Sequence, residues 1–398
     1  MSGREDAGWQ AATAPARRSA RIGVACRILA VLLCAIFVRA VGEFYHPGSG
    51  FTALIGFPQD TGDEPPVLRA VPHAQYPAYA SYDGQFYATR ALDPLLRDPS
   101  IDRYMDLAPY RARRILFSWT AYLAGLGRPA WILEAFALQN VVCWGLLAIV
   151  LRRWFDLRRP RGLALWAACL FAHGMLWSVR FALLDGPSLL LICVSVLLIE
   201  KGRPLAAAAL TSVGVLGRET NVFAAVAYPI PATWRDWRRA LAAAVLVVAP
   251  VLVWMDYLRS VYRSLLLQDT DQAAAPGSAF VWALQRTWHS VGTSGVLSFA
   301  TIDLLLLVAL AVQACYLAVR IRPHQPWWRV AVAYLALASV MDRVLWDPNT
   351  AAVTRVLLPL TVGFNVLLRD ERSPHRFWCW FAVGNLHLLA SPWVMPIL

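Results

Sequence analysis

The sequence predicts an all-α, polytopic integral membrane protein with about 11 transmembrane helices. Hydrophobic residues make up 58% of its 398 residues, charged residues only 16%, and the mean hydropathy is +0.49. Soluble folds do not contain so much apolar sequence. The formal net charge is +12, but the basic residues occur in short clusters between apolar runs instead of one stripe. That distribution is typical of topology-setting loops and argues against a nucleic acid partner.

The first apolar run extends from Ile22 to Val41 and follows residues 1–20, an Ala- and Arg-rich segment that we expect to be disordered. A cleaved signal peptide is the alternative, but the leader is long, Arg39 interrupts the end of the run and the cleavage pattern is poor. We therefore expect a first membrane helix. The basic residues that place the N-terminus in the cytoplasm are Arg17, Arg18, Arg21 and Arg27.

Residues 42–114 are polar and broken by prolines, which predicts a long loop outside the cytoplasm. Within it we expect one short helix from near Asp83 to the Asp93-Pro94 step and another beginning with Pro94, where a missing N–H costs nothing. The next apolar piece, residues 115–126, is too short to cross a bilayer of roughly 30 Å.

Ten further apolar runs follow, and with residues 115–126 not spanning, every later basic cluster falls on the cytoplasmic side. The runs are 131–151, 163–180, 187–200, 204–217, 220–232, 241–259, 295–319, 328–346, 351–368 and 376–396. Because a crossing at 115–126 would move all of those clusters outside, the distribution of positive charge supports the assignment.

The segment YASYDGQFYATRALDP, residues 79–94, is the candidate active-site segment because it is polar and aromatic-rich in a mostly apolar chain. As a general base, Asp83 would take the proton of an attacking hydroxyl. Helical spacing places Tyr87 and Arg90 on the same face as this acid. The alternative is that Asp83 only caps the short helix, and both roles are compatible.

The predicted topology places several other polar sites on the same side of the membrane as Asp83. They are Asp185 in LLDGP, Arg218 and Glu219 in LGRETN, a loop at about 260–294, and a cluster of Asp342, Arg343, Asp347 and Asn349. Ionisable groups at helix ends that face one compartment indicate a site shared between helices. We therefore expect Asp83, Asp185 and Arg218 to converge on one outward-facing cavity.

The segment YDGQFYATRALDP followed by YRARRILFSW resembles a bacterial family of membrane proteins of cell-surface glycopolymer formation, which has YDGQFYY, an LALDP-like step and YRYRRIL. That family is similar to the GT-C superfamily of polyprenyl-phosphate-dependent glycosyltransferases. The lipid A aminoarabinose transferases are a broader match. They have an acid in the first outer loop, an aspartate before a proline and a lysine in an LTKGP turn, and Asp83, Asp185 and Arg218 occupy these places in order.

The resemblance covers roughly residues 20–235, and the arginine in place of lysine leaves open what the LGRET turn contacts. It divides the chain into residues 1–20, a GT-C-like membrane module at 21–235 with an outer loop at 42–130, and a variable membrane module at 236–398. It implies a bacterial plasma-membrane enzyme with a cytoplasmic N-terminus and an extracytoplasmic active site, which transfers a sugar with inversion from a polyprenyl-phosphate carrier to a glycan or lipid acceptor.

The leaving phosphate requires cations, and the candidate substrate-binding residues are Tyr82, Gln85, Tyr87, Arg111, Arg113, Arg114, Asp185, Arg218 and Glu219. Other roles remain open for several of them: an ion pair for Arg218 with Glu219 or Asp185, lipid head-group contact for the three clustered arginines, a helix-terminus role for Asp185, and an interfacial position for the tyrosines.

No cofactor is predicted, and a divalent metal stays an alternative because some GT-C enzymes use one. The histidines and cysteines lack ligand-like spacing. The Asp269-Thr270-Asp271 sequence resembles a metal-binding DxD motif but lies on the side away from nucleotide sugars. The alternative function is a non-enzymatic flippase, transporter or assembly partner for lipid-linked glycans. A flippase would need charged residues along a path to the cytoplasmic side, and the sequence shows few.

Overall fold

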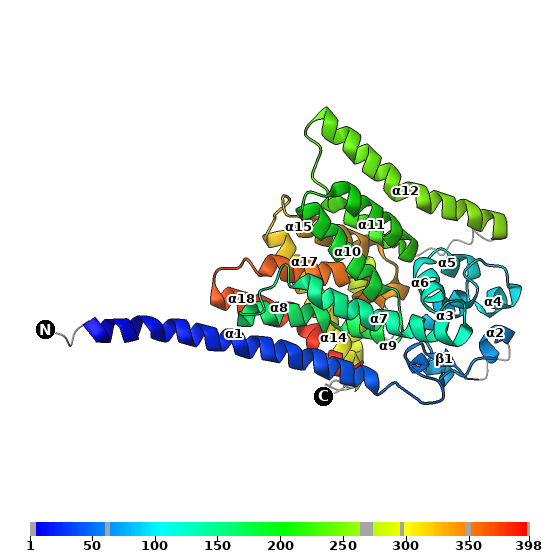
Figure 1. Cartoon of the computed structure of the whole chain (residues 1–398), viewed down its shortest axis with the longest axis horizontal. Coiled ribbons are helices and arrows are strands. Elements are labelled where there is room, and N and C mark those ends of the chain that lie inside the picture. Colours follow the sequence, from blue (N-terminus) through cyan, green and yellow to red (C-terminus); the bar gives the residue numbers. More distant parts are fainter. Residues whose placement is uncertain (1–4, 60–63, 263–273, 295–297, 347–351, 396–398) are drawn as a thin grey trace.

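The structure is a computed structural model that describes residues 5–59, 64–262, 274–294, 298–346 and 352–395. Almost all of these residues that lie in regular elements are helical, which confirms the predicted all-α class (Figure 1). Short outer-loop elements gather at one end of a helical bundle, and the long helices α1 (Glu5–Gly42) and α12 (Trp234–Tyr262) lie on opposite flanks. The outer loop therefore covers the bundle end at which several helices begin or stop.

Four helices in the described part of the chain are long and apolar enough to cross a membrane: α1 within Ala20–Gly42, α7 (Pro129–Leu151), α12 and α14 (Phe299–Val319). The bent pair α8 (Pro160–Leu170) and α9 (His173–Arg180), with 44° between its helices, is a fifth candidate. Exposed apolar side chains on both flanking helices, such as Val31 and Val253, suit contact with lipid. The total of about 11 crossings remains a prediction.

Several predicted runs are broken or shorter than a membrane crossing. The run at 220–232 is a nine-residue 3-10 helix, η3 (Glu219–Ala227), followed by Pro229 and Pro231, which disfavour continuation of a helix. The run at 351–368 is split into α16 (Ala352–Val356) and α17 (Leu358–Leu368). The sequence predicts disorder for residues 1–20, but the helix α1 already begins at Glu5. The reason is that an Ala- and Arg-rich composition favours helix.

The outer loop is built from short helices and one parallel pair of two-residue strands, β1 (Phe57–Pro58) and β2 (Gln75–Tyr76). Its helical elements are η1 (Thr52–Leu54), α2 (Pro66–Arg69), η2 (Ala78–Ala80), α3 (Gly84–Leu92), α4 (Pro99–Tyr104), α5 (Ala108–Ala112) and α6 (Leu116–Ala124). The helix predicted after Asp83 is confirmed as α3. The next helix begins at Pro99, not at Pro94, because the Asp93 carboxylate accepts hydrogen bonds from the Arg97 and Asp98 backbone N–H groups and closes a turn.

The remaining elements complete the bundle. They are α10 (Asp185–Glu200), α11 (Pro204–Gly217), α13 (Ser278–Ser294), α15 (Pro326–Val340), η5 (Arg343–Trp346), α18 (Pro374–Gly384), η7 (Leu386–Leu389) and η8 (Ser391–Trp393). The helix α13 lies in the segment 260–294 that we predicted as a loop. Its buried residues Ala279, Ala283 and Thr287 are four apart, so one face packs on the bundle and the other is exposed.

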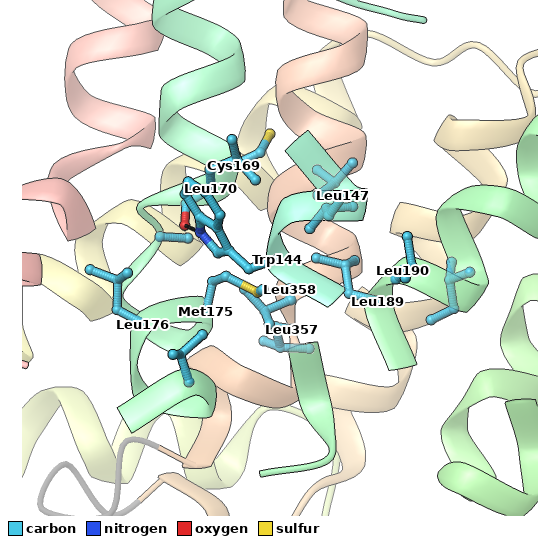
Figure 2. Close-up of a cluster of buried hydrophobic side chains, with 14 of the residues drawn as sticks. Trp144, Leu147, Cys169, Leu170, Met175, Leu176, Leu189, Leu190, Leu357 and Leu358 are labelled. Carbon is cyan, nitrogen blue, oxygen red and sulfur yellow. Dashed lines mark hydrogen bonds between the residues drawn. The ribbon is translucent and has the colours of Figure 1, made fainter. Parts of the chain in front are cut away.

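The core near the site packs residues of α8, α9, α10 and α17 around Trp144 of α7 (Figure 2). The indole Nε1 of Trp144 donates a hydrogen bond of 2.9 Å to the Leu170 carbonyl, and its ring stacks on Phe37. Met175 of α9, Leu189 of α10 and Leu357, which follows α16, are fully buried beside it. This packing fixes the helix ends that provide the polar residues described next.

Candidate active site

A cavity of about 330 Å³ lies where the outer loop meets the ends of α9, α10, α11 and α16. Seven of the residues proposed from sequence line it: Tyr82, Asp83, Tyr87, Arg111, Arg114, Asp185 and Arg218. Asp106, Tyr110 and Arg355 line it too, and the sequence analysis did not single them out. The structure therefore brings Asp83, Asp185 and Arg218 to one cavity, although they come from distant parts of the chain.

Asp83 stands immediately before α3, but its side chain makes no capping hydrogen bond to that helix. Its Oδ1 instead accepts a hydrogen bond of 2.9 Å from Arg111 Nη2. The following residue, Gly84, packs so closely that a Cβ there would lie 2.0 Å from the Phe181 carbonyl oxygen and 2.9 Å from that of Ile55. The backbone at Asp83 is therefore held between the loop and the end of α9, and its carboxylate is directed at the cavity.

Arg111 links two carboxylates that line the cavity. Its Nε donates to Asp106 Oδ1 at 2.9 Å and its Nη2 to Asp106 Oδ2 at 2.6 Å, in addition to the Asp83 contact. The guanidinium lies 4.7 Å from the Phe86 ring centroid and 5.3 Å from that of Tyr87. These contacts leave only 7% of its side chain exposed.

The electrostatic surroundings keep Asp83 ionised. Burial raises the pKa of the Asp83 carboxyl, but the guanidinium groups of Arg111 and then Arg355 outweigh that effect and hold its pKa below the usual value. Burial lowers the pKa of Arg111, and its interactions with Tyr87, Asp106 and Asp83 raise it well above the ordinary value. Both groups are therefore charged at neutral pH.

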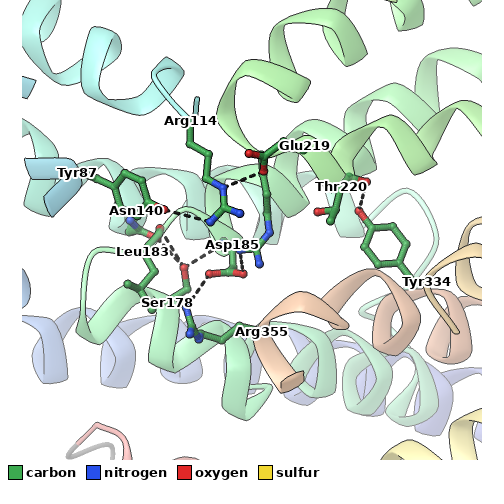
Figure 3. Close-up of polar contacts among 12 residues, drawn as sticks. Tyr87, Arg114, Asn140, Ser178, Leu183, Asp185, Glu219, Thr220, Tyr334 and Arg355 are labelled. Atoms are coloured by element: carbon green, nitrogen blue, oxygen red, sulfur yellow. Dashed lines mark hydrogen bonds and ion pairs between the residues drawn. The ribbon is translucent and has the colours of Figure 1, made fainter. Parts of the chain in front are cut away.

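Arg114 joins the outer loop to the start of η3 (Figure 3). Its Nε donates to Glu219 Oε2 at 2.8 Å, and its Nη1 donates to the Tyr87 hydroxyl at 3.1 Å. Its Nη2 donates to the Tyr110 hydroxyl at 2.7 Å. Tyr87 thus receives hydrogen bonds from both Arg111 and Arg114, which keeps the two guanidinium groups side by side on one wall.

Asp185, the first residue of α10, is almost completely buried and pairs with two arginines. Arg218 Nη1 donates to its Oδ1, and Arg355 Nη1 donates to its Oδ2 at 3.1 Å. Of the ion pairs left open for Arg218, the structure therefore shows the one with Asp185, whereas Glu219 pairs with Arg114.

The turn before Asp185 is held by Ser178 of α9 (Figure 3). The Gly186 backbone N–H donates to Ser178 Oγ at 2.8 Å. The Ser178 hydroxyl lies 3.1 Å from both Asn140 Oδ1 and the Leu183 carbonyl oxygen, either of which can accept its one proton. Ser178, Asn140 and Leu183 are all buried, so this network fixes the orientation of the first turn of α10.

Arg355 is one of the cavity-lining residues that the sequence analysis missed. It belongs to α16, in a run that we predicted as a plain membrane crossing, and its Nη2 donates to the Tyr82 hydroxyl at 2.9 Å. The N-terminus of α9 supports it, because a Cβ on Gly174 would lie 2.4 Å from the Thr354 carbonyl oxygen. The available signal was an arginine within an apolar run, which by default marks a functional site.

Other candidates lie outside the cavity lining. Gln85 is buried and accepts a hydrogen bond of 2.7 Å from the Tyr104 hydroxyl, and Arg113 does not line the cavity. Arg90, expected beside Asp83, instead pairs with Asp102 and reaches the Tyr262 hydroxyl at the end of α12. Its charge attracts the loop acid opposite, so α3 presents Arg90 away from the cavity.

The possible metal motif Asp269-Thr270-Asp271, together with Asp347 and Asn349, lies outside the described residues. Within the part of the chain that the structure does describe, no group of three or more His, Cys, Asp or Glu side chains is arranged to hold a metal ion. A divalent metal therefore remains the alternative that the sequence analysis named.

No protein-family model and no curated protein matches the sequence. Among solved structures, the chain is similar to the crystal structure of ArnT from Cupriavidus metallidurans in the apo state, with 18% sequence identity and a TM-score of 0.43. The similarity covers 75% of this chain and 56% of that chain. This chain therefore matches little more than half the length of that protein.

Proposed function

We propose that the chain is a membrane glycosyltransferase of the GT-C type, which transfers a sugar from a polyprenyl-phosphate carrier to a hydroxyl of a glycan or lipid acceptor. The observation on which this proposal depends is that Asp83 shares one cavity with the guanidinium groups of four arginines, Arg111, Arg114, Arg218 and Arg355. A carboxylate next to fixed cations suits a reaction that moves a proton and releases a phosphate.

In this reaction the acceptor oxygen attacks the anomeric carbon while its proton passes to Asp83. The bond between the anomeric carbon and the phosphate oxygen breaks, and the phosphate leaves with the electron pair as polyprenyl phosphate. Attack opposite the leaving group inverts the anomeric configuration. Asp83 Oδ2 accepts no hydrogen bond from the described residues, so this oxygen is open for the acceptor hydroxyl.

The charge balance of the cavity suits the leaving phosphate. The four arginines pair with four carboxylates: those of Asp83, Asp106 and Asp185, which line the cavity, and that of Glu219, which pairs with Arg114 and is not part of the lining. When Asp83 accepts the proton, one guanidinium charge is no longer compensated, at the moment when the phosphate gains negative charge. The Nε atoms of Arg218 and Arg355 are buried without a hydrogen-bond partner among the described residues. A phosphate oxygen could accept a hydrogen bond from these N–H groups.

The cavity also has an apolar wall, which supports a substrate with a hydrocarbon chain. Leu183 and Leu184 precede α10, Val344 and Leu345 belong to η5, and Val356 ends α16. These apolar side chains line the same cavity as the arginines, so an amphipathic molecule could place its phosphate at the cations and its first carbons on the leucines and valines.

We further propose that the reaction takes place on the extracytoplasmic face of a bacterial plasma membrane, with the N-terminus in the cytoplasm. The distribution of positive charge in the sequence supports this orientation, because the basic loops then face the cytoplasm and the outer loop with Asp83 faces away. The chain's own residues provide the base and the cations, so no metal is assigned a step.

The test is Asp83→Asn in cells that lack the native gene, with surface glycans and glycolipids analysed by mass spectrometry. Asn keeps the shape but cannot accept the proton, so the product formed by the wild-type protein should fall by roughly 10²–10⁴-fold at equal protein level in the membrane. Glu43→Gln is the matched control, because Glu43 is an exposed loop acid 3.8 Å from Arg39 and outside the cavity. Wild-type product from the Asp83→Asn protein would reject the enzyme and favour a transporter for lipid-linked glycans.

A further inference from the structure

Arg111 is shared unequally between Asp106 and Asp83. Asp106 accepts two hydrogen bonds from the guanidinium, at 2.9 Å from Nε and 2.6 Å from Nη2, in the bidentate geometry that arginine and carboxylate prefer. Asp83 accepts only one, at 2.9 Å, from the same Nη2. Asp106 is therefore the dominant partner, although sequence reasoning gave it no role.

We propose that Asp106 is a positioning residue that keeps Arg111 from pairing fully with Asp83 and thereby keeps one oxygen of Asp83 free to accept a proton. The proposal rests on the proposed function only in naming Asp83 as the base. Its physical basis is that one guanidinium fork can meet one carboxylate edge to edge, so a fork bound to Asp106 cannot also enclose both oxygens of Asp83.

The surroundings of Arg111 make this division stable. The rings of Phe86, Tyr87 and Tyr110 lie 4.7, 5.3 and 5.6 Å from the guanidinium carbon. The Tyr87 hydroxyl also accepts a hydrogen bond of 3.2 Å from Nη1. These contacts restrict the guanidinium to its present plane, in which the edge formed by Nε and Nη2 faces Asp106.

Removing the Asp106 charge should lower the pKa of Asp83 and so make it a weaker base, through two changes that act in the same direction. A like charge near Asp83 disappears, and the Arg111 fork becomes available to it, so both changes favour the ionised carboxylate. The other charged or titratable groups facing Asp83 are Arg114 beyond α5, Arg355 from α16 and the neighbouring Tyr82, whose phenol interacts electrostatically with both Asp83 and Asp185. None of them changes in an Asp106 variant.

Labelling with dicyclohexylcarbodiimide tests the inference without any substrate, because this reagent adds to the protonated carboxyl group. The full-length protein in detergent micelles is labelled at a fixed, mildly acidic pH, and modification of Asp83 is followed by peptide mass spectrometry. Asp106→Asn should lower the pKa of Asp83 by roughly 0.5–1 pH unit, so the labelling rate should fall about three- to tenfold. Asp106→Glu keeps the charge and should label close to the wild-type rate.

Two further variants separate positioning from general loss of structure. Asp102→Asn breaks another, partly buried ion pair of the outer loop, with Arg90, and should lower the melting temperature without changing the labelling rate of Asp83. In an Arg111→Gln background, the effect of Asp106→Asn should shrink to less than half, because Asp106 acts through that arginine.

An unchanged or faster labelling rate of Asp83 in folded Asp106→Asn protein overturns the inference. So does an Asp106→Asn effect of undiminished size in the Arg111→Gln background. The Asp83→Asn cell experiment is independent of this result. If that variant keeps making product while Asp106→Asn still slows labelling, the proposed enzyme fails and the control of Asp83 protonation by Asp106 stands.

Discussion

Arg355 donates a hydrogen bond of 2.9 Å to the Tyr82 hydroxyl, across 273 positions of the sequence. The same guanidinium donates to Asp185 at 3.1 Å, so a single side chain of the C-terminal half connects the outer loop to the start of α10. The residue next to Tyr82 is Asp83. The hydrogen bonds of Arg355 to Tyr82 and to Asp185 therefore hold the candidate base and the Asp185–Arg218 pair in one arrangement.

Replacing Arg355 with Gln should reduce both activity and stability. Breaking a buried ion pair costs roughly 3–5 kcal/mol, but Asp185 keeps Arg218, so we expect a smaller loss of about 1–3 kcal/mol in the free energy of unfolding. Product formation should fall at least tenfold, because one of the four cations of the cavity is gone. Thermal unfolding in detergent and product analysis in cells measure the two effects.

The matched control is Arg372→Gln, since Arg372 is an exposed arginine of the same half of the chain and does not line the cavity. Normal activity with normal stability in the Arg355→Gln protein would contradict the connecting role.

Replacing Gly84 with Ala should displace Asp83 without changing any charge. The new Cβ would lie 2.0 Å from the Phe181 carbonyl oxygen, a contact that only a backbone shift can relieve. Overpacking of this kind costs about 1–3 kcal/mol, and a shift of about 1 Å in a catalytic group can cost about 10²-fold in rate. Gly145→Ala in α7 is the control, because nothing lies within 4 Å of its Cβ position. Equal product from both variants would show that the position of Asp83 is not critical.

Local patterns were sufficient to predict part of the site. Asp83 follows from a polar, aromatic-rich segment of the long loop, and Asp185 and Arg218 follow from short motifs at the ends of apolar runs. These three residues do meet at one cavity. Arg355 was missed because its neighbours are apolar and hydropathy alone treats the run as a membrane crossing. Asp106 was missed because a loop acid five residues before an arginine looks like ordinary solvated charge, and only tertiary packing shows that it binds Arg111.

Hydropathy located the apolar runs of the fold better than it located their breaks. The helical class follows from composition, yet 163–180 is bent between α8 and α9, and the first part of 220–232 is the 3-10 helix η3. These breaks depend on close packing, such as Gly174 on the Thr354 carbonyl, and on the ion pair of Glu219 with Arg114. Such contacts join distant segments and have no signature in a window of neighbouring residues.

Replacing Ser178 with Ala should loosen the turn that presents Asp185. The Gly186 N–H loses its acceptor at 2.8 Å and remains buried, which costs about 1–3 kcal/mol. Ser188→Ala is a close control, because the Ser188 hydroxyl in the first turns of the same helix is buried and has no hydrogen-bond partner among the described residues. We expect a lower melting temperature and reduced product for Ser178→Ala alone, and similar values for the two variants would contradict the support that we assign to Ser178.

Replacing Arg111 with Gln should move the acid limb of the activity profile to higher pH. The guanidinium of Arg111 is the largest of the influences that hold the pKa of Asp83 down against the raising effect of burial. Its removal should therefore raise that pKa, by about 1 unit, so that Asp83 becomes protonated at a higher pH and activity is lost earlier on acidification. Labelling of Asp83 by dicyclohexylcarbodiimide at a fixed, mildly acidic pH should become about tenfold faster, opposite in sign to the Asp106→Asn effect. Arg111→Lys keeps a positive charge and should change the rate less, whereas slower labelling in the Gln variant would show that Arg111 does not control the protonation of Asp83.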